Sequence, residues 1–451
     1  MQQRSNTEKW LVSQFMKPLA LLKNRTVKNA GYLIVGKVIQ MAFSLVIGLL
    51  TARYLGPSNY GLMNYAGAYT AFFTAVCTLG INNVLVKEFI DHPGEEGKVI
   101  GTTLGLRAIS SILSSIIIVL ISSVLDADEP TTRLVVGLAS IGMIFNIAET
   151  FNYWFQSRLE SKITAGATLG AYLISSVYKV FLLITGKSVA YFALVSSLDY
   201  LCLGIILFIQ YRKHSGGKLQ FSRNYGKELF RRSRHFILSG LMISIYGQTD
   251  KLMLKQMIND AEIGYYSTAV ALCGMWCFIL NAVIDSVYPS IMEAAKNENE
   301  PLFRQRNVQL YAIVFYLAVF VSLCFTSLAR PLISIMYGES YLPAVAPLRI
   351  ITWYTAFSYL GVARNAWIVS KERQKYLFGI YASSAVANVI LNYLLIPSMG
   401  ASGAAIASLI AQVLTTLVVP FFMKDMRENS MLILDAILLK GILWDRPKTE
   451  V

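Results

Sequence analysis

The feature that most constrains this chain is the recurrence of long apolar runs along its whole length. Between about residue 29 and about residue 423 the sequence returns repeatedly to stretches of about 18 residues or more with few charges. As a helix, such a run crosses about 30 Å of hydrocarbon. Because no water reaches the backbone inside a bilayer, each segment must satisfy its hydrogen bonds internally, as a helix does. The sequence therefore predicts an all-α polytopic membrane protein.

The composition agrees with this class and excludes several others. Of the 451 residues, 55% are hydrophobic and 15% are charged, whereas a soluble domain carries about 25% charged residues. The net charge of +14 does not indicate a nucleic-acid partner, because no basic stripe is interleaved with exposed aromatic residues. The five cysteines and three histidines lack the spacing of a metal or catalytic site. We therefore expect no cofactor and no metal.

About twelve transmembrane helices are predicted, six on each side of a polar, basic break. Their ranges are 29–53, 60–86, 99–125, 132–156, 163–186, 189–211, 235–258, 263–292, 307–336, 344–370, 375–397 and 400–423. The expected organisation is a cytoplasmic arm (1–28), a first lobe (29–211), a cytoplasmic linker (212–234), a second lobe (235–423) and a cytoplasmic amphipathic tail (424–451). Asp435 and Lys440 interrupt the tail, so we interpret it as an interfacial helix anchored by Trp444.

The distribution of lysine and arginine predicts the orientation in the membrane. Basic residues crowd the arm, the linker and the loop at 371–375, whereas the loops on the other side hold few. Because cytoplasmic loops carry the excess of Lys and Arg, both termini are expected in the cytoplasm of a multi-pass protein of the cell membrane.

A hairpin near the start of the chain carries a family resemblance. The stretch ARYLGPSNYG (52–61), an apolar helix and LGINNVLVKE (79–88) resemble the first hairpin of the polysaccharide-transporter branch of the MOP exporter superfamily, the Wzx-like oligosaccharide flippases. The segments PLISIMYGESYLPAVAPLR (331–349) and NVILNYLLIPSMGASGAA (388–405) extend it into the second lobe. The resemblance implies two six-helix bundles around a central cavity with alternating access, and a lipid-linked oligosaccharide as substrate.

Short internal matches support the division into two lobes. Gly61 and the apolar helix after it resemble Gly264 and its helix, and Gly186-x-Ser188-x-Ala190 resembles Gly400-x-Ser402-x-Ala404. Each repeat would contain an even number of spans, so both lobes would insert in the same sense, related by an axis along the membrane normal.

Polar and ionisable residues within or at the ends of the spans are the candidates for substrate binding, because each is costly in lipid unless it faces protein or water. The predicted substrate-binding residues are Lys37, Arg53, Arg107, Glu149, Lys179, Asp250, Lys251, Arg364 and Asn365. Cations predominate, and a wet cationic cavity attracts a lipid diphosphate. A structural alternative stays open. Glu149 with Lys179, or Asp250 with a cation, would be pairs that hold helices together, and the side chains of Lys37, Lys251 and Arg349 would extend to an interface.

Polar and aromatic residues of the fourth span are candidates for sugar contacts. They are Asn146, Asn152, Tyr153, Trp154 and Gln156. Amides and aromatic faces suit hydroxylated rings, but Trp154 fits an interfacial anchor equally well.

The leading functional hypothesis is a transporter, not an enzyme, that flips a polyprenyl-(di)phosphate-linked oligosaccharide from the inner to the outer leaflet. A coupling ion (H⁺ or Na⁺) and polysaccharide-assembly proteins are further candidate partners. Two alternatives remain: a MATE-like multidrug or cation antiporter, which favours an acidic cavity, and a membrane-embedded polysaccharide polymerase or ligase, which needs a larger outside loop or an acidic metal motif.

Overall fold

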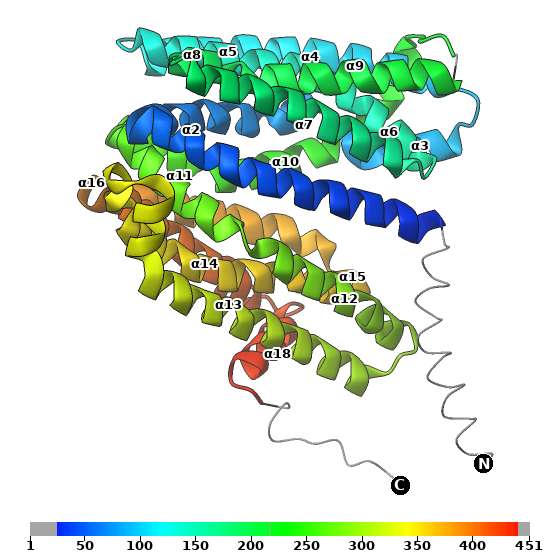
Figure 1. Ribbon diagram of the computed structural model, residues 1–451. Helices are drawn as coiled ribbons and strands as arrows, with labels where there is room; N and C mark the ends of the chain where they lie inside the picture. The colour runs from blue at the N-terminus through cyan, green and yellow to red at the C-terminus, as the bar shows by residue number, and fades with distance from the viewer. Residues whose placement is uncertain (1–24, 216, 441–451) are drawn as a thin grey trace, which may run out of the picture. The chain divides into compact units, whose positions relative to one another are not determined.

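The computed structural model describes residues 25–215 and 217–440 (Figure 1). All regular elements within these ranges are helical, as the apolar runs predict. The expected arm at 1–28, apart from its last residues, and the expected anchor Trp444 lie outside the described residues.

The chain separates into two compact units. The first contains Met1–Gly48 and Thr74–Leu238, and the second contains Leu49–Phe73 and Ser239–Val451. The helices α2 (Arg25–Cys77) and α10 (Arg223–Met257) contribute to both units. The lobe boundaries expected from the sequence stay a prediction.

The first unit is a bundle of antiparallel helices. Besides its parts of α2 and α10 it contains α3 (Asn82–Asp91), α4 (Glu96–Leu125), α5 (Pro130–Phe145), the 3₁₀ turn η1 (Asn146–Glu149), α6 (Thr150–Ser157), α7 (Ser161–Ile184), α8 (Val189–Ala193) and α9 (Val195–Ser215). Its buried core joins α3, α4, α6, α7, α9 and the first part of α10 around Trp154 and Tyr211.

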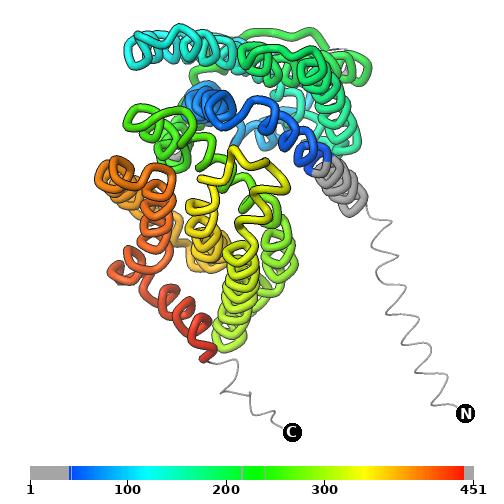
Figure 2. Tube along the Cα trace, turned by 60° about the vertical axis from the view of Figure 1, so that its left-hand side comes forward, coloured from blue at the N-terminus to red at the C-terminus, as the bar shows by residue number. Residues whose placement is uncertain are grey.

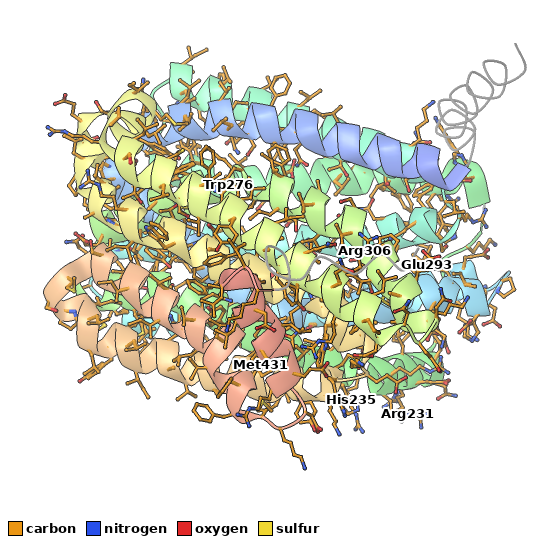
Figure 3. The ribbon with its side chains drawn as sticks, turned by 90° about the horizontal axis from the view of Figure 1, so that it is seen from below. Arg231, His235, Trp276, Glu293, Arg306 and Met431 are labelled. Carbon is orange, nitrogen blue, oxygen red and sulfur yellow. The ribbon has the colours of Figure 1, made fainter. Side chains whose placement is uncertain are left out.

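The second unit has its own core. Its helices are α11 (Asp260–Gly274), α12 (Cys277–Lys296), α13 (Glu300–Tyr337), α14 (Val345–Ala363), α15 (Asn365–Ser370), α16 (Leu377–Val413), α17 (Val419–Phe422) and α18 (Arg427–Ile437), with 3₁₀ turns η2 (Glu339–Ala344) and η3 (Gln374–Tyr376) and the π-helical turn η4 (Leu414–Val418). Glu293 and Arg306 lie near the ends of α12 and α13 that meet, and Trp276 lies just before the other end of α12 (Figure 3).

Eight helices among the described residues are long and apolar enough to cross a membrane. Two of them, Phe43–Asp91 and Gln374–Phe422, are 49 residues long and bend sharply at Gly56 and Gly400. Helices α10 and α14 coincide with two more predicted spans but are not among the eight. The helical membrane fold is confirmed, and the count of twelve stays a prediction.

Glycine permits the sharp bends. The backbone of Gly400 has φ +54°, and a Cβ there would overlap the carboxylate of Glu262, which accepts a hydrogen bond from the Ala401 N–H at 2.6 Å. An acidic group at the start of a helical segment also meets the positive end of its dipole. Gly186, the counterpart of Gly400 in the predicted repeat, has φ +65°, so the two matched motifs share an unusual backbone conformation as well as a sequence pattern.

A second repeated feature is the interruption of alternate spans. Every second predicted span, counted from 60–86, departs from regular α-helix at one place within the span. The breaks lie at Thr78–Ile81, Asn146–Glu149, Leu194, Met275–Trp276, Arg364 and Leu414–Val418. The described parts of the intervening spans run without such a break. Because a break frees backbone groups inside the bundle, polar side chains must satisfy them there.

The segment Leu49–Phe73 packs closely within the second unit. A Cβ at Gly61 would overlap the Asp260 carbonyl, and a Cβ at Gly264 would overlap the Pro57 carbonyl. Tyr341 donates its hydroxyl to the Ala52 carbonyl at 2.7 Å. The two glycines that the sequence matches as repeats therefore allow the helix starts to approach backbone to backbone.

The linker after α9 is fastened to the first unit. The Gln220 N–H donates to the Gly97 carbonyl at 3.0 Å, and the buried carboxylate of Glu88 accepts from Tyr225 at 2.8 Å and from Arg232 at 2.7 Å. Burial and the neighbouring Glu88 carboxylate both raise the pKa of Tyr225, so its phenol stays neutral.

The end of the described chain is an amphipathic helix, α18, that packs against α13 (Figure 2). Leu432 and Ile433 join the core of the second unit, whereas Met431 is 43% exposed (Figure 3). Asn429 donates to the Tyr311 hydroxyl at 2.7 Å, with both residues buried. This part of the tail is therefore fixed to the bundle by packing and by a buried hydrogen bond.

Candidate functional site

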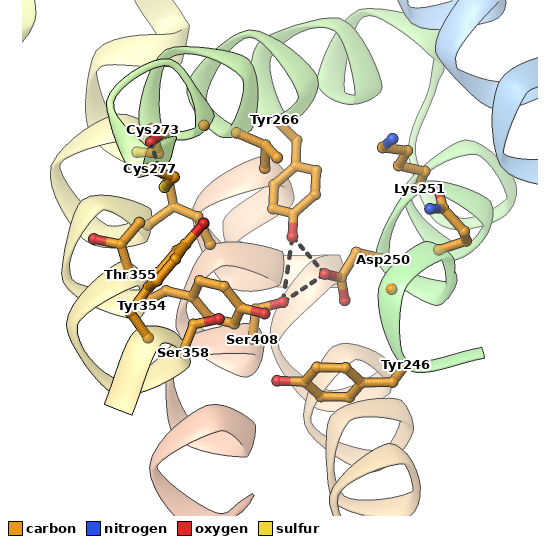
Figure 4. Close-up of a pocket in the computed structure, with 16 residues that line it drawn as sticks. Tyr246, Asp250, Lys251, Tyr266, Cys273, Cys277, Tyr354, Thr355, Ser358 and Ser408 are labelled. Atoms are coloured by element: carbon orange, nitrogen blue, oxygen red, sulfur yellow. Dashed lines mark hydrogen bonds between the residues drawn. The ribbon is translucent and has the colours of Figure 1, made fainter. Parts of the chain in front are cut away.

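A buried carboxylate, Asp250, is the centre of a polar site within the second unit (Figure 4). It lies on α10, and its partners come from α11 and α16. Asn388 and Asn392 are four residues apart, so they share one face of α16, and the bend at Gly400 returns the chain so that Ser408 meets them.

The carboxylate of Asp250 is surrounded by neutral donors. It accepts hydrogen bonds from Asn388 at 3.1 Å and Asn392 at 2.6 Å, from Ser408 at 2.5 Å and from the hydroxyl of Tyr266. Asp250 is 3% exposed. Such a set of donors compensates much of the cost of removing a carboxylate from water, but it leaves the net charge in place.

A cavity of about 260 Å³ opens beside this carboxylate. Four tyrosines contribute to its walls: Tyr246, Tyr266, Tyr354 and Tyr359. Ser358, Thr355, Cys273 and Cys277 add smaller groups, and Lys251 leaves α10 next to Asp250 (Figure 4). The cavity therefore combines phenol and hydroxyl groups with one acid and one cation.

A chain of hydrogen bonds leads from the cavity wall to the break in the last span. Tyr246 donates to the Gln412 amide oxygen at 2.6 Å, and Gln412 donates to the Thr416 hydroxyl at 3.0 Å. Arg364, which is fully buried, donates to the carbonyls of Thr415 at 3.1 Å and Thr416 at 3.4 Å. The guanidinium thus satisfies carbonyls that the π-helical turn frees.

This geometry gives Arg364 a structural role within the second unit. Its head group points at backbone carbonyls of its own unit, at the position where α14 ends and α15 begins. Asn365, the next predicted substrate contact, is exposed. A contact of either residue with substrate stays a prediction.

The first unit contains a corresponding buried arginine. Arg107 on α4 is 1% exposed and donates to the side chains of Thr150 at 3.0 Å and Asn146 at 3.1 Å. Glu149 lies 3.8 Å from its guanidinium. Arg107 therefore braces the 3₁₀ turn in the fourth predicted span, and the acid nearest to it is Glu149.

The remaining predicted site residues lie apart from these clusters. Arg53 donates to the carbonyls of Met336, at 2.9 Å, and Ile335. Lys179 is partly exposed and interacts electrostatically with Asp199 rather than with Glu149. Lys37 is on α2, and its side chain lies outside the described residues.

The proposed sugar-binding cluster has one member in the core. Trp154 is fully buried, and the guanidinium of Arg158 lies 4.3 Å from its ring centre. Asn146 accepts from Arg107, whereas Asn152 and Tyr153 are partly exposed. Trp154 therefore packs inside the first unit in this conformation.

Sequence reasoning missed four residues of the Asp250 site: Tyr266, Asn388, Asn392 and Ser408. A signal was present in NVILN, where two asparagines stand four residues apart in an apolar helix. Polar residues at that spacing share a helix face and need partners inside the bundle.

Among the described residues no group of three or more His, Cys, Asp or Glu side chains gathers in a metal site. The amides of Asn388 and Asn392 direct N–H groups at the carboxylate of Asp250, and Asn392 also has a buried amide oxygen with no hydrogen-bond partner. Turning these amides would direct oxygens, in place of N–H groups, toward a cation bound beside the carboxylate. Carboxylate, amide and hydroxyl oxygens are ligands that hard cations prefer.

Comparison with known protein families shows to which family the chain belongs. Residues 26–295 match the family model described as "Polysaccharide biosynthesis protein", and this range is more than half of the chain. The chain belongs to the polysaccharide biosynthesis protein family.

Individual relatives agree with this family and with the fold. A capsular polysaccharide biosynthesis protein, CapF of Staphylococcus aureus, is 24% identical over 407 residues, which are 88% of this chain and 99% of the relative. The fold is similar to that of the lipid II flippase MurJ in an inward closed conformation, with a TM-score of 0.67 and 14% identity over 92% of this chain and 93% of that one. An inward-facing MATE family multidrug transporter of the MOP superfamily gives a TM-score of 0.65 and 14% identity, over 88% and 96% of the two chains.

These findings confirm the MOP-type fold and the expected resemblance. The proteins named above that share this fold are a lipid II flippase and a MATE multidrug transporter. The described residues of this chain include several helices long and apolar enough to cross a membrane.

Proposed function

We propose that the protein flips a polyprenyl-(di)phosphate-linked oligosaccharide from the inner to the outer leaflet of the cell membrane by alternating access, with both termini in the cytoplasm. The observation that carries this proposal is the family match over residues 26–295. Two relatives support it, since one is a capsular polysaccharide biosynthesis protein and the other, similar in fold, is a lipid II flippase. The headgroup would cross through the protein while the polyprenyl chain stays in lipid.

We propose further that Asp250 holds the coupling ion. The hydrogen bonds of this buried carboxylate come from neutral groups, so they leave its negative charge in place, and either Na⁺ or a proton would neutralise it. Two amides and a hydroxyl surround the carboxylate, and each would offer an oxygen to Na⁺ once its hydrogen-bond donor turned away, whereas a proton needs only one acceptor. Proteins of polysaccharide assembly remain candidate partners.

The predicted substrate contacts fall into two groups under this proposal. Arg107 and Arg364 are buried, and each donates hydrogen bonds to residues at a break in a span. We therefore assign them a structural role. Glu149 and Lys179 are partly exposed and are the better candidates for groups that meet the headgroup, whereas Lys251 lines the Asp250 cavity.

A second candidate function is a MATE-like multidrug or cation antiporter. The observation in its favour is the similar TM-score of 0.65 to an inward-facing MATE transporter. Extrusion of a cationic dye from proteoliposomes, driven by a Na⁺ or pH gradient, tests it directly.

A flipping assay in proteoliposomes tests the leading proposal. A fluorescent polyprenyl-diphosphate oligosaccharide is placed in both leaflets, and a membrane-impermeant reagent reports how much has changed leaflet. We expect transport that depends on a Na⁺ gradient and that falls at least tenfold in Asp250→Asn. As the matched control, Glu298→Gln neutralises an exposed carboxylate of the same unit and should transport normally. Dye extrusion without lipid transport would refute the flippase assignment, and transport driven only by a pH gradient would assign the coupling ion as H⁺.

A further inference from the structure

The Asp250 cavity contains one charge of each sign. Of the described residues that line it, Asp250 and Lys251 are the charged ones, and the rest are tyrosines, small polar residues, cysteines and apolar residues. The pair is therefore electrically neutral without any bound ion. A second monovalent cation would bring the cavity to a net charge of +1.

Lys251 is placed to act on Asp250 through space. The two residues are neighbours on α10, so their side chains leave the helix about 100° apart, as 3.6 residues per turn require. The hydrogen bonds of the carboxylate come from Tyr266, Asn388, Asn392 and Ser408, not from the ammonium.

The ammonium of Lys251 is not fixed by other contacts. Within residues 25–215 and 217–440 it makes no hydrogen bond or ion pair, and the acid that acts on it electrostatically is Asp250. Its side chain is partly exposed. A compact charge on a flexible four-carbon stem can approach or leave the carboxylate without a change in the backbone.

We propose that Lys251 is a tethered countercharge for Asp250 that competes with the coupling cation. This inference rests on the proposed cation site at Asp250. In the cation-free protein the ammonium compensates the negative charge of the buried carboxylate. The empty transporter can therefore change back to its starting conformation without an isolated charge in its interior. Binding of the cation then requires the ammonium to retreat into the cavity, which weakens cation affinity and favours release.

The physical basis is the repulsion between two like charges that share one low-dielectric cavity. Removing the ammonium charge abolishes this repulsion and leaves the ligand oxygens untouched. We therefore expect Lys251→Met to bind Na⁺ at least about tenfold more tightly, which corresponds to about 1.4 kcal/mol. Lys251→Arg keeps the charge and should stay within about threefold of the wild type.

The test is equilibrium binding of ²²Na⁺ to the purified full chain in lipid nanodiscs. Lys251→Met, Lys251→Arg and Asp250→Asn are compared with the wild type, and Lys296→Met is the matched control, because it removes an exposed lysine of the same unit. Melting temperature in NaCl and in choline chloride is the second readout, since a ligand stabilises the folded state according to its affinity. The Na⁺-dependent rise should be larger in Lys251→Met than in the wild type.

The variants distinguish the countercharge role of Lys251 from the cation site at Asp250. If Asp250→Asn abolishes Na⁺ binding while Lys251→Met binds no more tightly than the wild type, the tethered countercharge is refuted and the cation site survives. If Asp250→Asn binds Na⁺ normally, the cation site itself is refuted, and the inference with it. Should Lys251→Met fail to fold, Lys251→Gln removes the same charge with a polar head group and decides the question.

Discussion

Replacement of Arg364 distinguishes a structural brace from a substrate contact. Arg364→Ala removes two hydrogen bonds to carbonyls of the π-helical turn, at 3.1 and 3.4 Å. A hydrogen bond from a charged group contributes about 1.5–3 kcal/mol, and the longer one less than the shorter. With the cavity that a large buried side chain leaves, we expect a total cost of about 3–5 kcal/mol.

This cost has a measurable consequence. For a unit of this size, each kcal/mol lowers the melting temperature by about 2–4 °C, so Arg364→Ala should melt about 6–20 °C below the wild type. Arg364→Lys keeps the charge but loses the fork of donors, and we expect it to recover only part of the stability. Arg349→Ala is the matched control, because it removes an exposed arginine of α14, the helix that ends just before Arg364, and should change stability by less than about 0.5 kcal/mol.

The assay pairs thermal unfolding in detergent with lipid flipping normalised to folded protein. If Arg364 has a structural role, Arg364→Ala should be less stable than the wild type, while its flipping rate per folded molecule should stay within about threefold of the wild-type rate. An Arg364→Ala protein that melts normally but flips at least tenfold more slowly would refute the brace and identify Arg364 as a substrate contact.

Three further predictions concern topology, packing and the tail. In intact cells a membrane-impermeant thiol reagent should label a cysteine that replaces Ser58 and not one that replaces Ser215, in a background without native cysteines; the reverse pattern would contradict the cytoplasmic linker. Gly264→Ala should disturb the segment Leu49–Phe73, because a Cβ there overlaps the Pro57 carbonyl; overpacking costs about 1–3 kcal/mol, and an unchanged melting temperature would count against this packing. Truncation after Met426 removes the buried face of α18, so it should lower the melting temperature measurably, and a truncated protein as stable as the full chain would show that α18 only lies on the surface.

Much of the fold follows from local sequence pattern. A run such as 99–125 is apolar enough to cross a bilayer in any tertiary context, and the structure has α4 at Glu96–Leu125. The match of Gly186 and Gly400 also anticipates two positions with positive φ. The interruption of alternate spans was not predictable in the same way, because a turn at Arg364 or Leu194 leaves the hydropathy of its span almost unchanged.

The sequence alone determined the helical membrane class, apolar helices such as 99–125 and the charged residues that lie within the apolar runs, because hydrophobicity acts on each segment independently. Only the tertiary structure decided what those charges do. Asp250 meets Asn392 and Ser408 across 142 and 158 residues of sequence, and Arg107 and Arg364 point at the breaks of neighbouring spans. The physical reason is that a charge in lipid must find a partner, and which partner it finds depends on how the helices pack.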